Sequence, residues 1–193
     1  RPRGQAAEPD LLPALTGRSG GGRDIVDDGR APLVVTLALP DDVQERLDAL
    51  RRERFPAGRT AVGAHLTLFH AVPGTLLTQV RQDLQAAAAT GPVGLRFSGV
   101  MSLGRGAAYA VESPDLARRH DELQRGWWPH LTRQDQQPLR AHVTLQNKVD
   151  AAVARTTVTT LRTGFQPFDV EAPGLDLWRY DGGPWTHLER FAG

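Results

Sequence analysis

Residues 64–68 read Ala-His-Leu-Thr-Leu, and residues 141–145 read Ala-His-Val-Thr-Leu. The second copy follows the first after 77 positions, so the match joins two distant parts of one chain. Side chains alternate between the two faces of a β-strand. If each copy lies in a strand, its histidine and threonine share one face and its aliphatic residues share the other. The pattern therefore predicts two strands that each bury one face and present a His-x-Thr pair on the other.

The residues around the first copy predict the order strand-helix-strand-helix-strand. Apolar and β-branched runs indicate strands over residues 33–39, 62–72 and 93–100. A carboxylate at Asp41 or Asp42 can cap the first helix. The second helix lies between Gly74 and Gly91, where a Gly-Pro pair ends it.

The same order returns around the second copy. Runs of the same kind indicate strands over residues 107–111, 139–147, 168–180 (one or two strands) and 185–191. Ser113, followed by proline, favours one helix start, and Asp150 can cap another helix that Gly164 ends. Equivalent elements lie 73 or 74 positions apart, which indicates an internal duplication. We therefore predict an α+β body of two pseudo-symmetric lobes, built from repeats of about 32–104 and 105–193.

The first 31 residues lie outside these repeats and show little apolar periodicity. We interpret residues 1–31 as a flexible N-terminal arm and residues 32–193 as a single domain. No run reaches the roughly 20 apolar residues of a membrane span, and no signal-peptide core is seen. A cytoplasmic protein without a membrane partner is the expectation.

Composition excludes several classes of protein. Hydrophobic residues make up 40% and charged residues 23% of the 193 positions, which excludes wholesale disorder. Because the chain has no cysteine, disulfide scaffolds, thiolate metal ligands and thiol nucleophiles are excluded together. The net charge is +1, whereas a protein that grips long duplexes usually has a stronger basic bias. A nucleic-acid partner is therefore expected to be short, or contacted at one end.

Two histidines across one cleft suit a particular chemistry. A pseudo-twofold relation between the lobes brings the two polar faces together, with His65 and His142 on opposite sides. Near neutral pH one imidazole can accept a proton while the other donates one, which suits in-line displacement at phosphorus. The hydroxyls of Thr67 and Thr144 can donate to the non-bridging phosphate oxygens. This chemistry requires neither a metal nor a cofactor.

The paired motifs in a duplicated α+β body resemble the two-histidine (2H) phosphoesterase superfamily. Within it, the chain is most similar to bacterial 2′-5′ RNA ligase-like proteins that act as RNA 2′,3′-cyclic phosphodiesterases. The resemblance covers roughly residues 32–193. It implies antiparallel sheets around a central cleft, with helices packed on the outside.

The resemblance also implies an activity and its residues. The activity is metal-independent hydrolysis of a 2′,3′-cyclic phosphate, on an RNA end or a nucleotide, to a 2′-phosphate. His65 and His142 are then the acid and the base, in an order that the sequence does not decide, and Thr67 and Thr144 hold the phosphate. Joining RNA ends through a 2′-5′ linkage uses the same groups in the reverse direction. The implied role is in RNA processing, with no cofactor and no obligate protein partner, and we expect a monomer.

Four further residues are candidates for contacting the substrate. Strict alternation places Arg140 and Gln146 on the face of the second motif, where a guanidinium suits a phosphate. Phe69, on the face of Thr67 by the same reasoning, and Tyr109 can each stack an unpaired base. The alternative for Arg140 and Gln146 is a solvated strand edge, and for the two aromatic residues it is the core.

Other interpretations of the paired motifs remain open. The histidines can be structural, although their matched positions in a repeated body favour a site. Zinc needs a third ligand, and no neighbouring His-x₃-His or acidic cluster supplies one. A non-catalytic module can use the same cleft to bind an RNA end or a phosphorylated ligand. A cyclic phosphodiester other than RNA, such as ADP-ribose 1″,2″-cyclic phosphate, is an alternative substrate.

Overall fold

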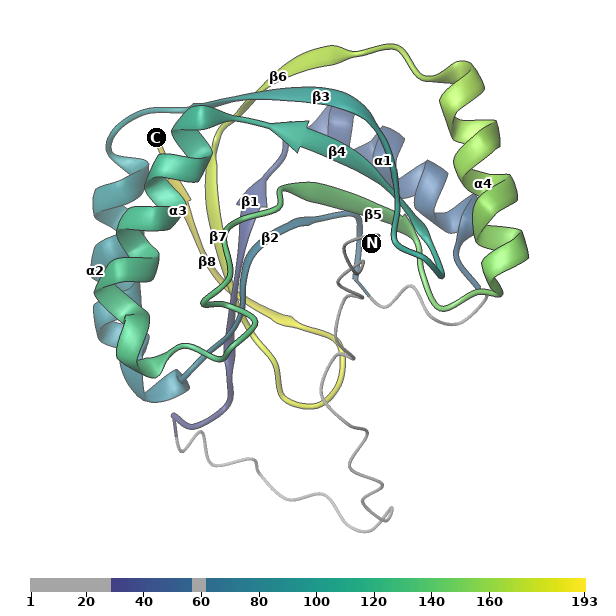
Figure 1. Ribbon diagram of the computed structural model, residues 1–193. Helices are drawn as coiled ribbons and strands as arrows, with labels where there is room; N and C mark the ends of the chain where they lie inside the picture. The colour runs from purple at the N-terminus through teal and green to yellow at the C-terminus, as the bar shows by residue number, and fades with distance from the viewer. Residues whose placement is uncertain (1–28, 57–61) are drawn as a thin grey trace, which may run out of the picture.

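Two antiparallel sheets of four strands each form the centre of the protein in a computed structural model that describes residues 29–56 and 62–193 (Figure 1). The first sheet contains, in spatial order, β2 (Leu66–Val72), β1 (Leu33–Ala38), β7 (Gly174–Arg179) and β8 (Thr186–Ala192). The second contains β5 (His142–Gln146), β4 (Ala107–Glu112), β3 (Val93–Ser102) and β6 (Phe168–Ala172). The predicted N-terminal arm falls mostly outside the described residues.

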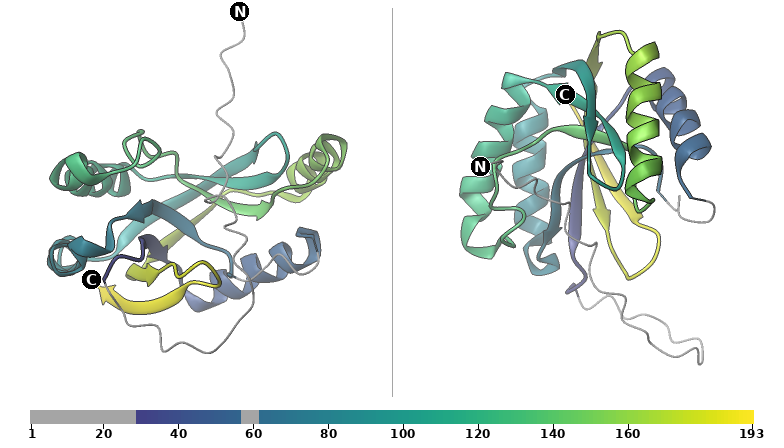
Figure 2. Two further views of the ribbon diagram at one scale, coloured as in Figure 1. Left: turned by 90° about the horizontal axis from the view of Figure 1, so that it is seen from below. Right: turned by 45° about the vertical axis from the view of Figure 1, so that its right-hand side comes forward.

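Four α-helices flank the sheets in two pairs. They are α1 (Asp41–Arg54), α2 (Leu77–Ala88), α3 (Pro114–Trp127) and α4 (Ala151–Gly164), with short 3-10 turns η1 (Gly74–Leu76) and η2 (Trp128–His130). Figure 2 shows α2 beside α3 at one side of the molecule and α1 beside α4 at the other. The predicted α+β class, with antiparallel sheets and flanking helices, is confirmed. No helix in the described part of the chain has the length and apolar character needed to cross a membrane.

The two sheets do not coincide with the two sequence repeats. Strand β3 belongs to the first repeat but lies in the second sheet, whereas β7 and β8 belong to the second repeat but lie in the first sheet. The cause is local, because only residues 103–106 separate β3 from β4 and Leu103 N–H donates to the Gly106 carbonyl at 3.0 Å. Antiparallel strands joined by so short a turn pair as a hairpin. Each sheet therefore contains strands from both halves of the chain.

The helix starts follow the sequence in part. Ser113 caps α3 as predicted, since its hydroxyl accepts a hydrogen bond from the Leu116 N–H and Pro114 occupies the first helical position. In α1 the cap residue is Pro40, and Asp41 lies inside the first turn, so the predicted aspartate cap is wrong. A negative charge in the first turn still interacts favourably with the helix dipole.

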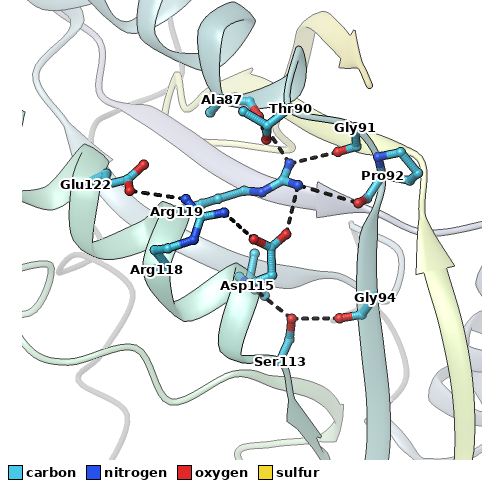
Figure 3. Close-up of polar contacts among 11 residues, drawn as sticks. Ala87, Thr90, Gly91, Pro92, Gly94, Ser113, Asp115, Arg118, Arg119 and Glu122 are labelled. Carbon is cyan, nitrogen blue, oxygen red and sulfur yellow. Dashed lines mark hydrogen bonds and ion pairs between the residues drawn. The ribbon is translucent and has the colours of Figure 1, made fainter.

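A buried arginine joins α3 to the end of α2. The guanidinium of Arg119 donates to the carbonyls of Ala87 at 3.1 Å and Gly91 at 2.8 Å, and pairs with Asp115 at 2.8 Å (Figure 3). Helices end with carbonyls that have no partner inside the helix. Arg119 satisfies such a carbonyl of α2 from a helix of the other repeat, and so ties the two halves together.

Both motif strands begin later than predicted. The expected strand over 62–72 starts at Leu66, and the expected strand over 139–147 starts at His142. In the first case α1 binds the preceding backbone, because Gln44 Nε2 donates to the Ala64 carbonyl at 2.8 Å and Asp48 accepts from the Ala64 N–H. Groups that bond to the helix are not available to a sheet ladder.

Candidate active site

The two His-x-Thr motifs lie on neighbouring edges of the two sheets. Strands β2 and β5 are each the first strand of their sheet, and they contact one another. His65 directly precedes β2, and His142 begins β5. Both histidines and both threonines, Thr67 and Thr144, are half-buried, so each is within reach of a ligand.

Each histidine ring is held in the same way. His65 Nδ1 donates to the Gly63 carbonyl at 2.7 Å, and His142 Nδ1 donates to the Arg140 carbonyl at 2.7 Å. A carbonyl oxygen only accepts, so Nδ1 carries the proton in both rings. In a neutral imidazole the lone pair then lies on Nε2, which is the atom that can exchange a proton with a substrate. The same backbone contact thus favours the same tautomer in both rings.

The two strands also share a break in their pairing. Thr67 pairs with Thr36, but the next matched pair on that side is Phe69 with Val35, so the register shifts after the threonine. In the second sheet the register likewise shifts between Thr144 and Gln146. Such a bulge turns the following residue to the opposite face, and bulges are frequent next to active sites.

This shift corrects the placement of two predicted contacts. Phe69 has 0% exposure, and its ring stacks on His120 with the centroids 4.6 Å apart. Gln146 is 4% exposed and donates to the Arg54 carbonyl at 3.1 Å. Both side chains therefore lie in the interior, on the face opposite the motif threonines. Strict alternation failed for both because each follows a bulge.

The other two predicted contacts differ from one another. Arg140 is exposed and adjoins the second motif, where it also supplies the carbonyl for His142. Tyr109 is 8% exposed, lies opposite Val143 and contacts the Phe165 ring at 5.0 Å. It therefore lies on the apolar face of its strand and not beside His142. Burial raises the pKa of its phenol, against the opposing charges of Arg54 and Arg46.

Helix α1 supports both motifs. Arg51, which is 8% exposed, donates from Nη1 to the Thr144 carbonyl at 2.6 Å. At its other end the helix holds the segment before His65 through Gln44 and Asp48. A Cβ on Gly63 would come within 2.9 Å of the Asp48 carboxylate, so a larger residue there would displace the side chain that holds Ala64. One helix therefore fixes parts of both sheets.

A buried carboxylate links the first motif strand to the loop before the second. Asp135 accepts from the backbone N–H groups of His70 at 2.8 Å and Ala71 at 2.9 Å, and its carboxylate lies 3.0 Å from His70 Nδ1. Burial alone would raise the pKa of Asp135, but these hydrogen bonds outweigh it and lower the pKa. The ionised carboxylate therefore binds β2 to the segment that leads into β5.

The sheet face beside His65 contains residues that the sequence analysis missed. Direct cross-strand partners share a face, and the row that starts at Thr67 continues through Thr36, Asp176 and Arg190. Asp176 accepts from Arg190 Nε at 2.8 Å and lies 2.9 Å from His187 Nε2. A charged residue inside the apolar strand sequence Gly-Leu-Asp-Leu-Trp-Arg was the available signal.

Two tryptophans lie on or beside this sheet face. Trp178 lies two residues after Asp176 on the same face, and its Nε1 donates to Thr36 Oγ1 at 2.8 Å. Trp185 lies just before β8, with its ring centroid 4.8 Å from that of His65. Within residues 29–56 and 62–193, no group of three His, Asp or Glu side chains could hold a metal ion.

Comparison with known proteins identifies the family. The model of the 2′-5′ RNA ligase superfamily matches residues 39–184, which is most of the chain. The chain belongs to the 2′-5′ RNA ligase superfamily. The predicted resemblance to 2H phosphoesterases is thereby confirmed, and the chain belongs to an enzyme superfamily that acts on phosphoesters. Among curated proteins, no sequence matches this chain.

Solved structures share the fold of this 2H phosphoesterase. TT0787 of Thermus thermophilus is 20% identical, with a TM-score of 0.58, over 83% of this chain and 97% of its own. E. coli LigT complexed with 3′-AMP is 19% identical, with a TM-score of 0.55, over 84% of this chain and 98% of its own. LigT complexed with NADP+ is 18% identical, with a TM-score of 0.55, over 84% and 97%. At these identities the comparison establishes the fold.

Proposed function

We propose that the protein hydrolyses 2′,3′-cyclic phosphates, on an RNA end or a nucleotide, to 2′-phosphates. The observation that carries this proposal is the matched pair of histidines at the starts of β2 and β5, two strands that contact one another. Both rings bond through Nδ1 to the carbonyl two residues earlier, at 2.7 Å in each case. Two equivalent imidazoles suit a reaction that needs one base and one acid.

The proposed reaction is an in-line displacement at phosphorus. One neutral histidine takes a proton at Nε2 from water, and the water oxygen forms a bond to phosphorus. The bond from phosphorus to the ribose 3′-oxygen breaks, and the other histidine, protonated at the start, gives that oxygen its proton. Thr67 and Thr144 donate hydrogen bonds to the non-bridging oxygens while negative charge shifts onto them. Proton exchange with solvent restores both rings.

The ligands of structural neighbours support a nucleotide substrate. LigT structures are described as complexes with 3′-AMP and with NADP+, so a protein of this fold accommodates nucleotides. The small net charge of +1 agrees with a partner that is contacted at one end. Metal independence, a cytoplasmic location and a monomeric state stay predictions from the sequence.

Phosphorus NMR tests the proposal most simply. The protein is mixed in excess EDTA with 2′,3′-cyclic AMP, and separately with a short RNA that ends in a cyclic phosphate. We expect the cyclic-phosphate signal to be replaced by that of a 2′-phosphate. Binding of either compound without turnover would contradict the proposal and favour a phosphate-binding module. Turnover of ADP-ribose 1″,2″-cyclic phosphate alone would assign a different substrate to the same site.

A further inference from the structure

Trp185 lies against the catalytic face on one side of the site. Its ring centroid is 4.8 Å from that of His65, with an angle of 51° between the ring planes. The residue is half-buried, so part of its indole is accessible. The superfamily match ends at residue 184, so Trp185 lies just beyond the matched region.

Neighbouring contacts hold this indole in place. The Trp178 ring centroid is 6.2 Å from that of Trp185. Trp178 is itself fixed, because its Nε1 donates to Thr36 Oγ1 at 2.8 Å and its ring meets that of His187 at 4.7 Å. His187 is in turn bonded to the buried Asp176 at 2.9 Å. Trp185 thus rests on an anchored network, which reduces the entropy lost when a ligand binds.

The surface beside the second motif is different. His142 pairs with Ala110, which pairs with Gly99, and Thr144 pairs with Ala108, which pairs with Met101. These neighbours offer no aromatic ring on the motif face. Phe69 and Tyr109, the aromatic residues expected to stack a base, are buried in the core. Among the described residues, therefore, the motif face beside His65 has an accessible aromatic ring next to it, and the motif face beside His142 does not.

We propose that Trp185 stacks on the base of the nucleotide that carries the cyclic phosphate. This inference rests on the proposed function and adds a recognition site to it. The base and the cyclic phosphate belong to one ribose, so a phosphate held between the motifs places the base beside them. Every nucleobase has a π-face, and stacking therefore selects nucleotides over base-free cyclic phosphates while tolerating different bases.

The test compares two substrates that differ only in the base. One is 2′,3′-cyclic AMP, and the other is methyl ribofuranoside 2,3-cyclic phosphate, which has the sugar and phosphate but no base. Trp185→Ala is expected to lower kcat/KM for cyclic AMP by about 5- to 150-fold, the range of base–aromatic stacking. It leaves kcat/KM for the base-free compound nearly unchanged. Trp185→Phe keeps most of the activity on cyclic AMP, and the exposed Trp128→Ala is the matched control.

Each outcome supports or overturns the inference. An equal loss on both substrates would overturn it, because Trp185 would then only position His65. If the wild type cleaves neither substrate, the proposed function fails and binding decides the inference separately. Binding of 2′-AMP and of methyl ribofuranoside 2-phosphate is then measured by isothermal titration calorimetry. Stacking predicts that Trp185→Ala weakens 2′-AMP binding selectively, and unchanged or equally weakened binding of the two compounds would contradict it.

Discussion

Strands β2 and β5 repeat the same local structure in two different surroundings. In both, the histidine Nδ1 bonds to the carbonyl two residues earlier, and the pairing register shifts after the threonine. Beside β2 the motif face continues into Thr36, Asp176 and Arg190. Beside β5 it continues into small or apolar residues, with Ala110 and Ala108 first.

The shared motif structure of β2 and β5 and their different neighbours have separate consequences. The proposed reaction needs one proton acceptor and one proton donor, and the duplicated motif offers one ring for each role. Recognition of one nucleotide needs unequal surroundings, because the base extends to one side of the phosphate. We therefore assign catalysis to what β2 and β5 share and selectivity to what differs beside them.

Removing either histidine is expected to have the largest effect. His65→Ala and His142→Ala should each lower kcat on 2′,3′-cyclic AMP by about 10²–10⁴-fold, because each removes one proton transfer. Since both rings act in one step, the double variant should lose much less than the product of the single losses. Steady-state rates measure this, with the exposed His130→Ala as control. A wild-type rate in either single variant would contradict the assignment of one proton transfer to each histidine.

The threonines should show a smaller, matched effect. Thr67→Val and Thr144→Val keep the side-chain shape but remove a hydroxyl donor, and each should lower kcat by about 10²–10³-fold. Thr67→Ser and Thr144→Ser, which retain a hydroxyl, should recover most of the rate. A loss at one threonine but not at the other would show that the phosphate oxygens are held from one sheet.

Arg51 tests whether the second motif depends on α1. Arg51→Met keeps the aliphatic stem but removes the donor to the Thr144 carbonyl, which should cost about 1.5–3 kcal/mol of unfolding free energy. We expect kcat to fall together with stability. Chemical denaturation and steady-state rates check this, and Arg52→Met, an exposed neighbour on the same helix, should be nearly neutral. Equal stabilities of the two variants would show that the hydrogen bond from Arg51 does not stabilise β5.

Asp135 should show the smallest effect, and a dependence on pH. Asp135→Asn replaces a carboxylate that accepts from His70 and Ala71, and should lower unfolding free energy at pH 7 by about 1–3 kcal/mol. The pKa of Asp135 is lowered in the folded protein, so its contribution is present above the unfolded-state pKa near 4. That contribution is lost as the pH falls through the lowered pKa.

Denaturation of wild type and Asp135→Asn at several pH values follows this change. The difference between them should be constant near neutral pH and shrink below about pH 4. Glu45→Gln, at an exposed position of α1 beyond its first turn, is the control. A difference that stays constant down to pH 2 would show that the charge of Asp135 does not hold β2 to the following loop.

Local patterns predicted the family and most of the fold. The spacing of Val43 and Leu47 in α1, and of Val80 and Leu84 in α2, correctly marks their buried faces. The repeated His-x-Thr pairs led to the family that the sequence comparison confirms. The helix faces and each single motif depend on neighbours within a few positions, where periodicity carries the information.

Features set by distant pairing could not be predicted in this way. The bulges that bury Phe69 and Gln146 depend on β1 and β4, so strict alternation along one strand misplaces both residues. The placement of β3, a strand of the first repeat, in the second sheet depends on its forming a hairpin with β4. Trp185 reaches His65 across 120 positions of sequence, and no local pattern indicates that contact.

The pH dependence of kcat/KM for 2′,3′-cyclic AMP tests the central claim most directly. The claim is that one histidine acts as a base and the other as an acid in the same step. Between about pH 5 and pH 9 the account predicts a bell-shaped profile, because one ring must be neutral and the other protonated. A profile with a single limb, or no dependence on pH, would contradict the account.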